Sequence, residues 1–292
     1  MKNPDHYHCN LCDYSTEQAN KDDLGEIKGN TAKYLEQSFP LWRCPQCKTI
    51  HSLEPVDFSE IYADYPLNHM RKLDIYARQT LGNLLKRLRK GGINKSSSIL
   101  DYGCGNGILA KYLKQKGYQN IDSYDPYVEP FTKKPTQQYD LVVLNDVLEH
   151  VEEPGDLLDL AADLVKKGGL LYAGTADSAG VDSMQDLEVH RMRLHQPFHR
   201  KIFTQEKLRE LGKQRNFQEL SIYTRSYMDT FFPFGNYRFL DEFCTALNHN
   251  MDLALDPSSA SIVIKKPKIL FYAFFGYFFP SADEPAMLWK KP

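Results

Sequence analysis

Apolar residues recur at two different periods along this 292-residue chain. Between residues 93 and 225, short apolar runs such as 141–144 alternate with stretches whose apolar positions repeat at helical spacing. The short runs predict buried strands, and the longer stretches predict amphipathic helices. Regular alternation of the two is typical of a parallel sheet with helices on both faces. We therefore expect an α/β core over residues 93–225.

The segments beside this core have a mainly helical pattern. Residues 60–92 present a recurring apolar face that ends at a glycine pair, which predicts helical linker or lid structure over 61–92. A similar face over 236–254 predicts that residues 226–292 form a helical cap with a final strand. Two short runs, 261–264 and 286–290, are alternative candidates for that strand.

A glycine-rich turn joins the first predicted strand of the core to a helix. Asp101 ends the strand, and glycines follow at positions 103, 105 and 107. A strand, glycine turn and helix build nucleotide sites at the carboxyl edge of parallel sheets, because the backbone can approach a ligand and the helix offers free N–H groups. The dinucleotide fingerprint has a third glycine where this chain has Ile108. The carboxylate of Asp101 suits a ligand with a positive amino group better than a pyrophosphate.

Two later strands also end in polar residues. Asp125 lies 24 residues after Asp101, where Rossmann-like folds bind ribose hydroxyls, although a turn-forming Asp-Pro with Pro126 is the alternative. The buried run 141–144 leads into Asn145 and Asp146. Ligands bind beyond the carboxyl ends of strands in open α/β sheets, so these residues are expected at the same site.

Four cysteines near the N-terminus have the spacing of a metal site. Cys9 and Cys12 form one Cys-x-x-Cys pair, and Cys44 and Cys47 form another. Two such pairs can supply four thiolates at the corners of a tetrahedron, which suits zinc. We expect residues 1–60 to be a zinc-binding module with a closed, structural site. Free cysteines or a redox pair are the alternatives.

The overall charge argues against an anionic partner. The chain has 36 Lys and Arg residues, 38 Asp and Glu residues and a net charge of −2, so no field of one sign recruits nucleic acid or a charged membrane. The most apolar segment, 269–280, is too short to span a bilayer. A polar N-terminus carries no secretory pattern. We expect a cytoplasmic protein without a nucleic-acid or membrane partner.

Together these motifs resemble those of known enzymes. The turn from Asp101 to Gly107 is similar to the first motif of class I S-adenosylmethionine (SAM) methyltransferases. The run Asp146-Val147-Leu148-Glu149-His150-Val151 resembles the E-x-L-E-H-V motif of the ubiquinone-biosynthesis-type and sugar C-methyltransferase branches, with Asp in place of the first Glu. The cysteine pairs followed by Tyr62 and Tyr65 look like the zinc-bearing sugar C-methyltransferases.

This resemblance implies a Rossmann-like sheet with flanking helices, and a set of residues that bind SAM. Those residues are Asp101, Gly103, Cys104, Gly105, Asn106, Gly107, Asp125, Pro126, Asn145, Asp146 and Val147. Residues 127–138 are short and polar, so the third strand of the family and its helix are expected to be truncated. His199, in a second motif similar to that branch, is the first candidate for a general base, and His150 is the second. For His150 a purely structural role is an equal alternative.

The implied reaction is in-line transfer of a methyl group to a small-molecule acceptor, such as a sugar or a natural-product-like metabolite. The acceptor and the methylated atom are not readable from the sequence. Two alternatives are an RNA methyltransferase that docks its substrate through the zinc module, and a non-catalytic SAM-binding protein. The near-neutral charge disfavours the RNA alternative, because phosphate contacts need clustered Lys and Arg.

Overall fold

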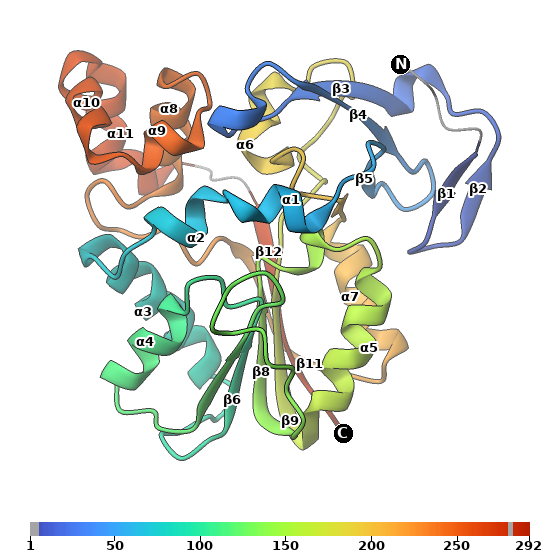
Figure 1. Ribbon diagram of the computed structural model, residues 1–292, viewed down its shortest axis with the longest axis vertical. Coiled ribbons are helices and arrows are strands. Elements are labelled where there is room, and N and C mark those ends of the chain that lie inside the picture. The colour runs from blue at the N-terminus through green and yellow to red at the C-terminus, as the bar shows by residue number, and fades with distance from the viewer. Residues whose placement is uncertain (1–5, 280–282) are drawn as a thin grey trace.

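The computed structural model describes residues 6–279 and 283–292, and its centre is a six-stranded sheet (Figure 1). The strands are β6 (Ile99–Tyr102), β7 (Ile121–Tyr124), β8 (Tyr139–Asn145), β9 (Val165–Gly174), β11 (Gln218–Arg225) and β12 (Asp283–Lys290). They lie in the order β11-β12-β9-β8-β6-β7. Strands β6 to β9 are parallel, and β12 runs antiparallel between β9 and β11. The predicted α/β fold class is confirmed.

Helices cover both faces of this sheet. They are α3 (Ile75–Arg89) and α4 (Ile108–Gln115) on one face, and α5 (Pro154–Leu164) and α7 (Gln205–Gln214) on the other. In β8, Leu141 and Val143 pack with α3 and α4, while Val142 and Leu144 pack with α5 and α7. Because side chains of a strand alternate between faces, a continuous apolar run is what a strand buried on both faces requires.

The edge of the sheet agrees with the expected truncation. Strand β7 is the last strand on its side, and residues 127–138 contain no helix or strand. At the other side, the closing strand is β12, whereas residues 261–265 form helix α10 (Ser261–Lys265). Strand β12 buries Met287 on one face and Leu288 on the other, as its internal position demands. In α10 only Val263 is buried.

The predicted helical stretch before the core is divided into three helices. They are α1 (Phe58–Ala63), α2 (Pro66–Met70) and α3. Pro66 begins α2, and a residue that precedes proline avoids the helical conformation. Asp74 caps α3 by accepting a hydrogen bond from the N–H of Ala77 at 2.8 Å. These two signals place loops at residues 64–65 and 71–74.

The N-terminal segment builds its own small sheets. A hairpin of β1 (Tyr7–Cys9) and β2 (Tyr14–Thr16) precedes a four-stranded sheet of β3 (Leu24–Lys28), β4 (Ser38–Arg43), β5 (Ile50–Ser52) and β10 (Lys201–Ile202). Strand β10 comes from the long segment after β9, so the N-terminal module and the core share one sheet. The boundary near residue 60 therefore stays a prediction.

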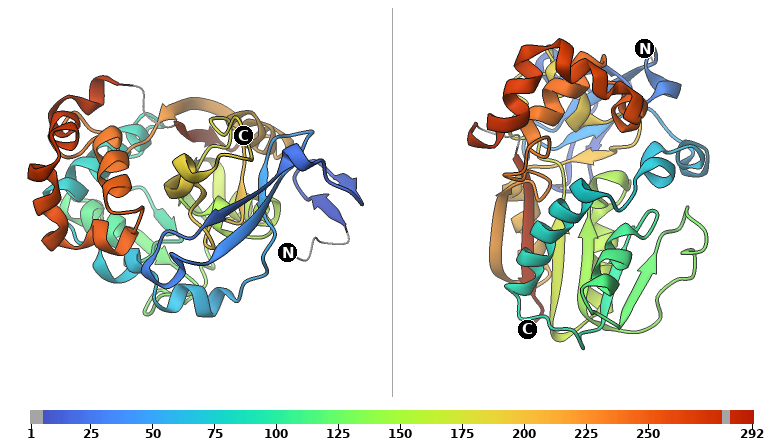
Figure 2. Two further views of the ribbon diagram at one scale, coloured as in Figure 1. Left: turned by 90° about the horizontal axis from the view of Figure 1, so that it is seen from above. Right: turned by 90° about the vertical axis from the view of Figure 1, so that its left-hand side faces the viewer.

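A group of small helices is inserted between β11 and β12. It comprises α8 (Tyr237–Ala246), α9 (Met251–Leu255), α10 and α11 (Pro267–Phe275), which lie together at one end of the molecule (Figures 1 and 2). The expected helical face over 236–254 is split, because Asn248 and His249 adopt positive φ angles between α8 and α9. Helix α9 touches the N-terminal module, where the N–H of Ala32 donates to Asp252 at 2.7 Å.

A buried arginine joins the N-terminal module to the core. Arg200 follows helix α6 (Arg191–Leu194) in the segment after β9, and its side chain is 2% exposed. Its guanidinium donates to the hydroxyl of Ser52 at 2.7 Å, to the carbonyl of Glu54 at 2.7 Å and to the carboxylate of Glu152 at 2.6 Å. Each contact lies in a different stretch of chain, so this one side chain ties β5, the loop after it and the segment after β8 together.

Candidate functional site

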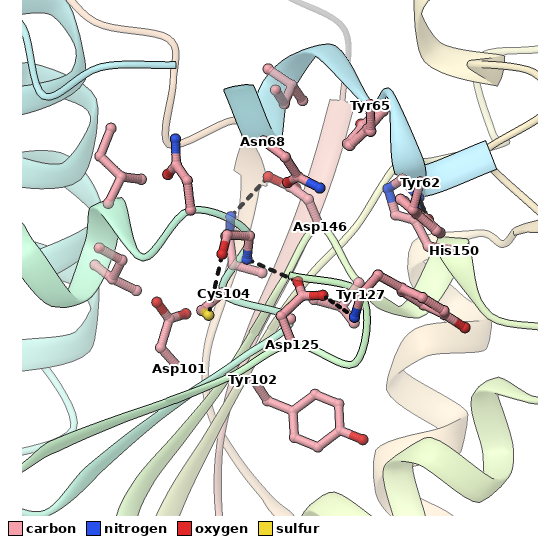
Figure 3. Close-up of a pocket in the computed structure, with 18 of the residues that line it drawn as sticks. Tyr62, Tyr65, Asn68, Asp101, Tyr102, Cys104, Asp125, Tyr127, Asp146 and His150 are labelled. Carbon is pink, nitrogen blue, oxygen red and sulfur yellow. Dashed lines mark hydrogen bonds between the residues drawn. The ribbon is translucent and has the colours of Figure 1, made fainter. Parts of the chain in front are cut away.

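A cavity of about 420 Å³ lies at the carboxyl ends of β6, β7 and β8 (Figure 3). Ligand pockets have volumes of this order. The structure brings ten of the eleven predicted cofactor residues to its lining, namely Asp101, Gly103, Cys104, Gly105, Asn106, Asp125, Pro126, Asn145, Asp146 and Val147. Gly107 lies outside the lining, at the start of α4, with a φ of 73°.

The glycine turn has the conformation that its sequence predicts. Gly103 has a φ of 72°, and a β-carbon there would lie 2.5 Å from the side chain of Val147. The carboxylate of Asp125 accepts from the N–H of Gly105 and from the N–H of Tyr127, each at 2.9 Å. Asp125 therefore holds the turn against the loop after β7, and keeps further lone pairs for a ligand.

Asp101 presents an unsatisfied carboxylate to the cavity. Its side chain is 5% exposed, and its Oδ2 has no hydrogen-bond partner among residues 6–279 and 283–292. Burial, helped by the nearby charge of Asp125, raises the pKa of Asp101 to about 7. A buried acid of this kind gains most from a cationic ligand, which would restore its charged form.

Arg71 also lines the pocket, although no sequence motif predicted it as a site residue. It lies in the loop between α2 and α3, and its carbonyl accepts from the side chain of Asn106 at 2.7 Å. Its guanidinium lies beside Tyr227 and Asp146, which raise the pKa of Arg71 and keep it charged. A fixed cation in a pocket otherwise rich in carboxylates can bind an anionic group of a ligand.

Asp146 lines the same cavity, close to Arg71 and Tyr227. It has a φ of 58°, a conformation that Asp adopts more readily than most residues. Its Oδ2 accepts from the side chain of Asn145 at 2.8 Å and from the hydroxyl of Tyr227 at 3.3 Å. Burial raises its pKa to about 6, although Arg71 opposes the shift.

Aromatic rings from α1 close over the cavity. The ring of Tyr62 stacks on Tyr127 with a centroid distance of 4.9 Å, and Phe58 stacks on Tyr127 at 6.2 Å. These contacts join α1 to the loop after β7, on two sides of the pocket. Tyr62 and Tyr65 both line the cavity.

Three histidines lie behind this lid. The rings of His150 and His199 meet at 4.6 Å, and those of His195 and His199 at 5.0 Å. The hydroxyl of Tyr62 bonds to Nδ1 of His150 at 2.7 Å, and that of Tyr65 bonds to Nε2 of His195 at 2.9 Å. Burial lowers the pKa of His150 and His195 well below the usual value, and that of His199 to about 4, so all three rings are neutral at pH 7.

The two candidate bases occupy different places. His150 is among the residues that line the cavity, whereas His199 is not. His199 is 8% exposed, and its Nδ1 donates to the carbonyl of Arg193 at 2.8 Å. That bond leaves Nε2 of His199 as an acceptor. His199 thus stands behind His150 with respect to the cavity.

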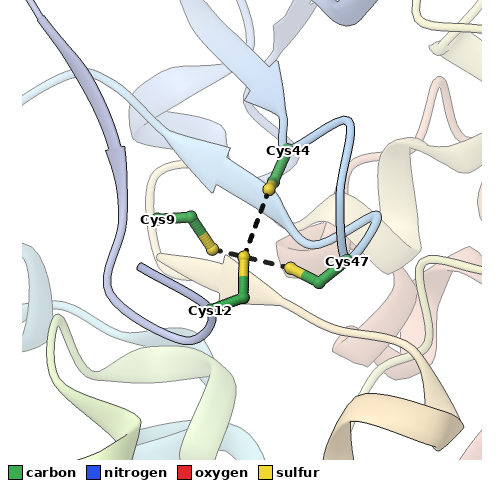
Figure 4. Close-up of side chains that lie close together, drawn as sticks. All are labelled: Cys9, Cys12, Cys44 and Cys47. Carbon is green, nitrogen blue, oxygen red and sulfur yellow. Dashed lines mark hydrogen bonds between the residues drawn. The ribbon is translucent and has the colours of Figure 1, made fainter. Parts of the chain in front are cut away.

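The four N-terminal cysteines converge from two tight turns (Figure 4). The Sγ atoms of Cys9 and Cys47 are 3.5 Å apart, those of Cys12 and Cys44 are 3.6 Å apart, and all four atoms lie within 4.8 Å of one another. Zinc–sulfur bonds of ~2.3 Å in a tetrahedron place sulfurs about 3.8 Å apart, so the set fits zinc. No disulfide joins the cysteines in the described part of the chain.

The cysteine cluster also contacts the core. The side chain of Asn10, between Cys9 and Cys12, donates to the carbonyl of Glu152 at 2.7 Å. Lys207 of α7 is buried near the thiols and donates to the carbonyl of Leu11 at 3.4 Å. A lysine in this place would offset the negative charge of a four-thiolate zinc site.

Comparison with known proteins identifies the core. The profile of a family described as a methyltransferase domain matches residues 73–222, about half of the chain. The chain belongs to this methyltransferase family. The resemblance seen in the glycine turn and in the segment after β8 is therefore confirmed at the level of the family.

Relatives with assigned names are similar to part of this chain. The ubiquinone biosynthesis O-methyltransferase of Klebsiella pneumoniae is 30% identical over 115 residues, which cover 32% of this chain and 47% of that protein. The enzyme of the same name from Yersinia pestis is 33% identical over 110 residues, covering 30% and 45%. The chain thus spans about half the length of the curated relatives it matches.

Solved methyltransferase structures are also similar to this chain. A putative sarcosine dimethylglycine methyltransferase from Galdieria sulphuraria has a TM-score of 0.46 and 15% identity, over 74% of this chain and 86% of that one. The 1,6-didemethyltoxoflavin-N1-methyltransferase of Burkholderia thailandensis has a TM-score of 0.46 and 12% identity, over 88% and 97%.

The buried acid of the methyltransferase core makes stability depend on pH. Burial raises the pKa of Asp101 from 3.8 to about 7, so over this range the folded, ligand-free protein holds a proton that the unfolded chain releases. Its free energy of unfolding therefore falls as the pH rises between these values. We predict that Asp101→Asn stabilises the ligand-free protein on the order of a few kcal/mol at pH 8 and little at pH 4.

Urea unfolding of both proteins at the two pH values measures this difference. Asp163→Asn, at an exposed position of α5, is the matched control and should change stability little at either pH. A gain for Asp101→Asn that is equal at pH 4 and pH 8 would contradict the assignment of the penalty to ionisation of Asp101.

Proposed function

We propose that the protein is a SAM-dependent methyltransferase that acts on a small-molecule acceptor. The observation that carries this proposal is the unsatisfied, buried carboxylate of Asp101 in a cavity that also presents Asp125 and Arg71. SAM has an ammonium, a carboxylate and a ribose diol, and these three residues offer one partner for each. Membership of a methyltransferase family supports the proposal.

Each pocket residue takes a role that follows from its surroundings. Asp101 would pair with the ammonium group, and Arg71 with the carboxylate. Asp125 would accept from the ribose hydroxyls, in place of or beside its backbone bonds. The other predicted residues that line the cavity would form the wall of the site. When bound, SAM supplies an activated methyl group, so the task of the protein is mainly to position the reactants.

Cofactor binding is tested by calorimetric titration with SAM and with S-adenosylhomocysteine. We expect wild-type protein to bind both. Asp125→Ala should weaken binding at least about tenfold, since a carboxylate that hydrogen-bonds a ligand contributes ~1.5 kcal/mol or more. Asp163→Ala, at an exposed position of α5 outside the cavity lining, is the matched control and should leave the affinity unchanged. Absence of binding to folded, metal-loaded wild-type protein would refute the proposed function.

We propose His150 as the general base, with His199 behind it. His150 lines the cavity, and burial lowers its pKa, so the ring is unprotonated at pH 7 and is a weaker base than a free imidazole. The hydroxyl of Tyr62 fixes the orientation of the ring through its bond to Nδ1. His199 lies against His150 but outside the lining, so its contribution would be to the position of His150.

Measurements of kcat distinguish the proposed roles of His150 and His199. With an acceptor found by screening hydroxylated, amine and carbon-acid compounds for S-adenosylhomocysteine release, His150→Gln should lower kcat about 10²-fold or more. The affinity for SAM should stay near that of wild type. His199→Gln should have the smaller effect. An unchanged kcat for His150→Gln would remove this residue as the base.

The named relatives favour a small molecule over RNA as the acceptor. Those relatives are called ubiquinone biosynthesis O-methyltransferases, which are named for reactions on small molecules. The net charge of −2 offers no general attraction to a polyanion. A sugar or natural-product-like metabolite remains our proposal for the acceptor class.

We also propose that Cys9, Cys12, Cys44 and Cys47 bind one structural zinc ion. All four ligand positions would be filled by thiolates, so the metal would have no open position for chemistry. Its contribution would be to hold β1 and the turn after β4 together, and with them the contact of Asn10 with Glu152.

Elemental analysis tests the zinc proposal. Wild-type protein should contain one zinc per chain, and Cys44→Ser should lose it and unfold at a lower temperature, because metal binding contributes directly to the stability of such sites. Cys244→Ser is the control, since Cys244 is buried in α8 away from the cluster and should leave the zinc content at one per chain. Full zinc content in Cys44→Ser would contradict the proposed ligand set.

A further inference from the structure

The helical cap exposes an apolar surface that the function described above does not use. Its members are large apolar side chains of α10, α11 and the turn after it, together with three phenylalanines of the loop after β11. We call this set the aromatic face: Phe231, Phe232, Phe234, Ile264, Leu270, Phe271, Phe274, Phe275 and Phe278. Each of these side chains is at least 40% exposed.

The sequence of α11 produces this face. The helix buries Ile269 and Ala273, which lie one turn apart and pack with α8. The opposite side carries Phe271 and Phe275, which are again one turn apart and contact each other at 5.2 Å. A helix that is apolar on all sides normally has neighbours on all sides. In the described part of the chain α11 has them on one side only.

Ring contacts join the loop and the helix into one surface. Phe234 packs against Phe274 with a centroid distance of 5.5 Å, and Phe231 packs against Phe278 at 5.6 Å. Soluble proteins seldom expose a continuous apolar patch of this kind unless it binds something. The face therefore has the character of a contact surface.

The charges beside the face identify its partner. Lys265, Lys266 and Lys268 precede or begin α11 and are exposed, and residues 257–282 include no Asp or Glu. One of the three, Lys268, pairs with Glu242 of α8 at 2.7 Å. Basic residues at the edge of an aromatic surface complement the headgroups of an anionic bilayer.

A second copy of the chain fits these charges less well. In a two-fold contact through α11 the facing surface would be the same stretch of a second copy, and residues 257–282 of that copy contain no acidic residue to pair with the lysines. Like charges across such a contact oppose association. An anionic lipid surface instead supplies the missing negative charge.

We propose that the aromatic face docks the protein onto the surface of an anionic lipid bilayer, with α11 lying in the interface. No helix among residues 6–279 and 283–292 is long and apolar enough to cross a membrane, so this contact is peripheral. It differs from the expectation of no membrane partner, which rested on net charge and on the length of the apolar segment. Neither quantity reports where aromatic and basic side chains gather on the folded surface. The proposal does not depend on methyl transfer.

Flotation with lipid vesicles tests this inference. The full-length, zinc-loaded protein should float with vesicles of phosphatidylcholine and phosphatidylglycerol, and much less with pure phosphatidylcholine. Phe274→Ser/Phe278→Ser should abolish flotation. Lys265→Gln/Lys266→Gln should lower the affinity for the anionic vesicles about fivefold for each lysine, and added salt should do the same.

Matched controls show whether position matters. Lys111→Gln/Lys114→Gln removes two exposed lysines from α4, and Ile75→Ser/Leu160→Ser removes two exposed apolar side chains from α3 and α5. Both should float like wild type. The lysine variants alter no packed side chain, so they keep the test valid if the phenylalanine variant fails to fold.

Two results would overturn the proposal. One is the absence of wild-type flotation with anionic vesicles, or flotation that is equal in the face variants and the controls. The other is a dimer, detected by sedimentation velocity, that Phe274→Ser/Phe278→Ser dissociates while wild type fails to bind vesicles. That second result would assign the face to a second copy of the chain.

Discussion

The buried guanidinium of Arg200 is the contact on which the arrangement of the site depends. It donates hydrogen bonds to Ser52 and Glu54 of the N-terminal module and to Glu152 of the core. The backbone N–H of Arg200 also donates to the carbonyl of Glu149 at 2.6 Å. A charge removed from water costs several kcal/mol unless partners surround it, so Arg200 is tolerated only when all these segments meet. Because Glu149 and Glu152 flank His150, the position of the pocket histidine depends on the N-terminal sheet.

The pocket itself contains acids whose charged forms are costly to bury in the absence of a ligand. Asp101 and Asp146 are buried acids whose pKa values are raised to about 7 and about 6, and the charge of Arg71 opposes both shifts. The strands hold these side chains in place through apolar packing on both faces of the sheet. The rigid sheet therefore keeps charged groups in position for a ligand that complements them, which is the usual basis of strong recognition.

The sequence predicted the core better than its surroundings, for physical reasons. The strand around Val142 and Val143 could be predicted, because a strand buried on both faces must be continuously apolar. The glycine turn can be read because its positive φ angles need glycine. Arg71 could not be found, since nothing local distinguishes it from a surface arginine, and only the packing of α1 to α3 brings it over the turn. The separation of His150 from His199 likewise depends on a long loop whose path local pattern does not determine.

Strand β10 has a consequence for how the molecule unfolds. Its two residues pair with β5, although they come from the segment after β9 and lie about 150 residues further along the chain. Removing the first 60 residues would leave the backbone groups of β10 without partners, in addition to exposing the core beneath them. The N-terminal module is thus not an appendage that could be deleted or exchanged. The N-terminal module and the methyltransferase core should unfold as one cooperative unit. Loss of metal from the cysteine cluster would therefore also destabilise the methyltransferase core.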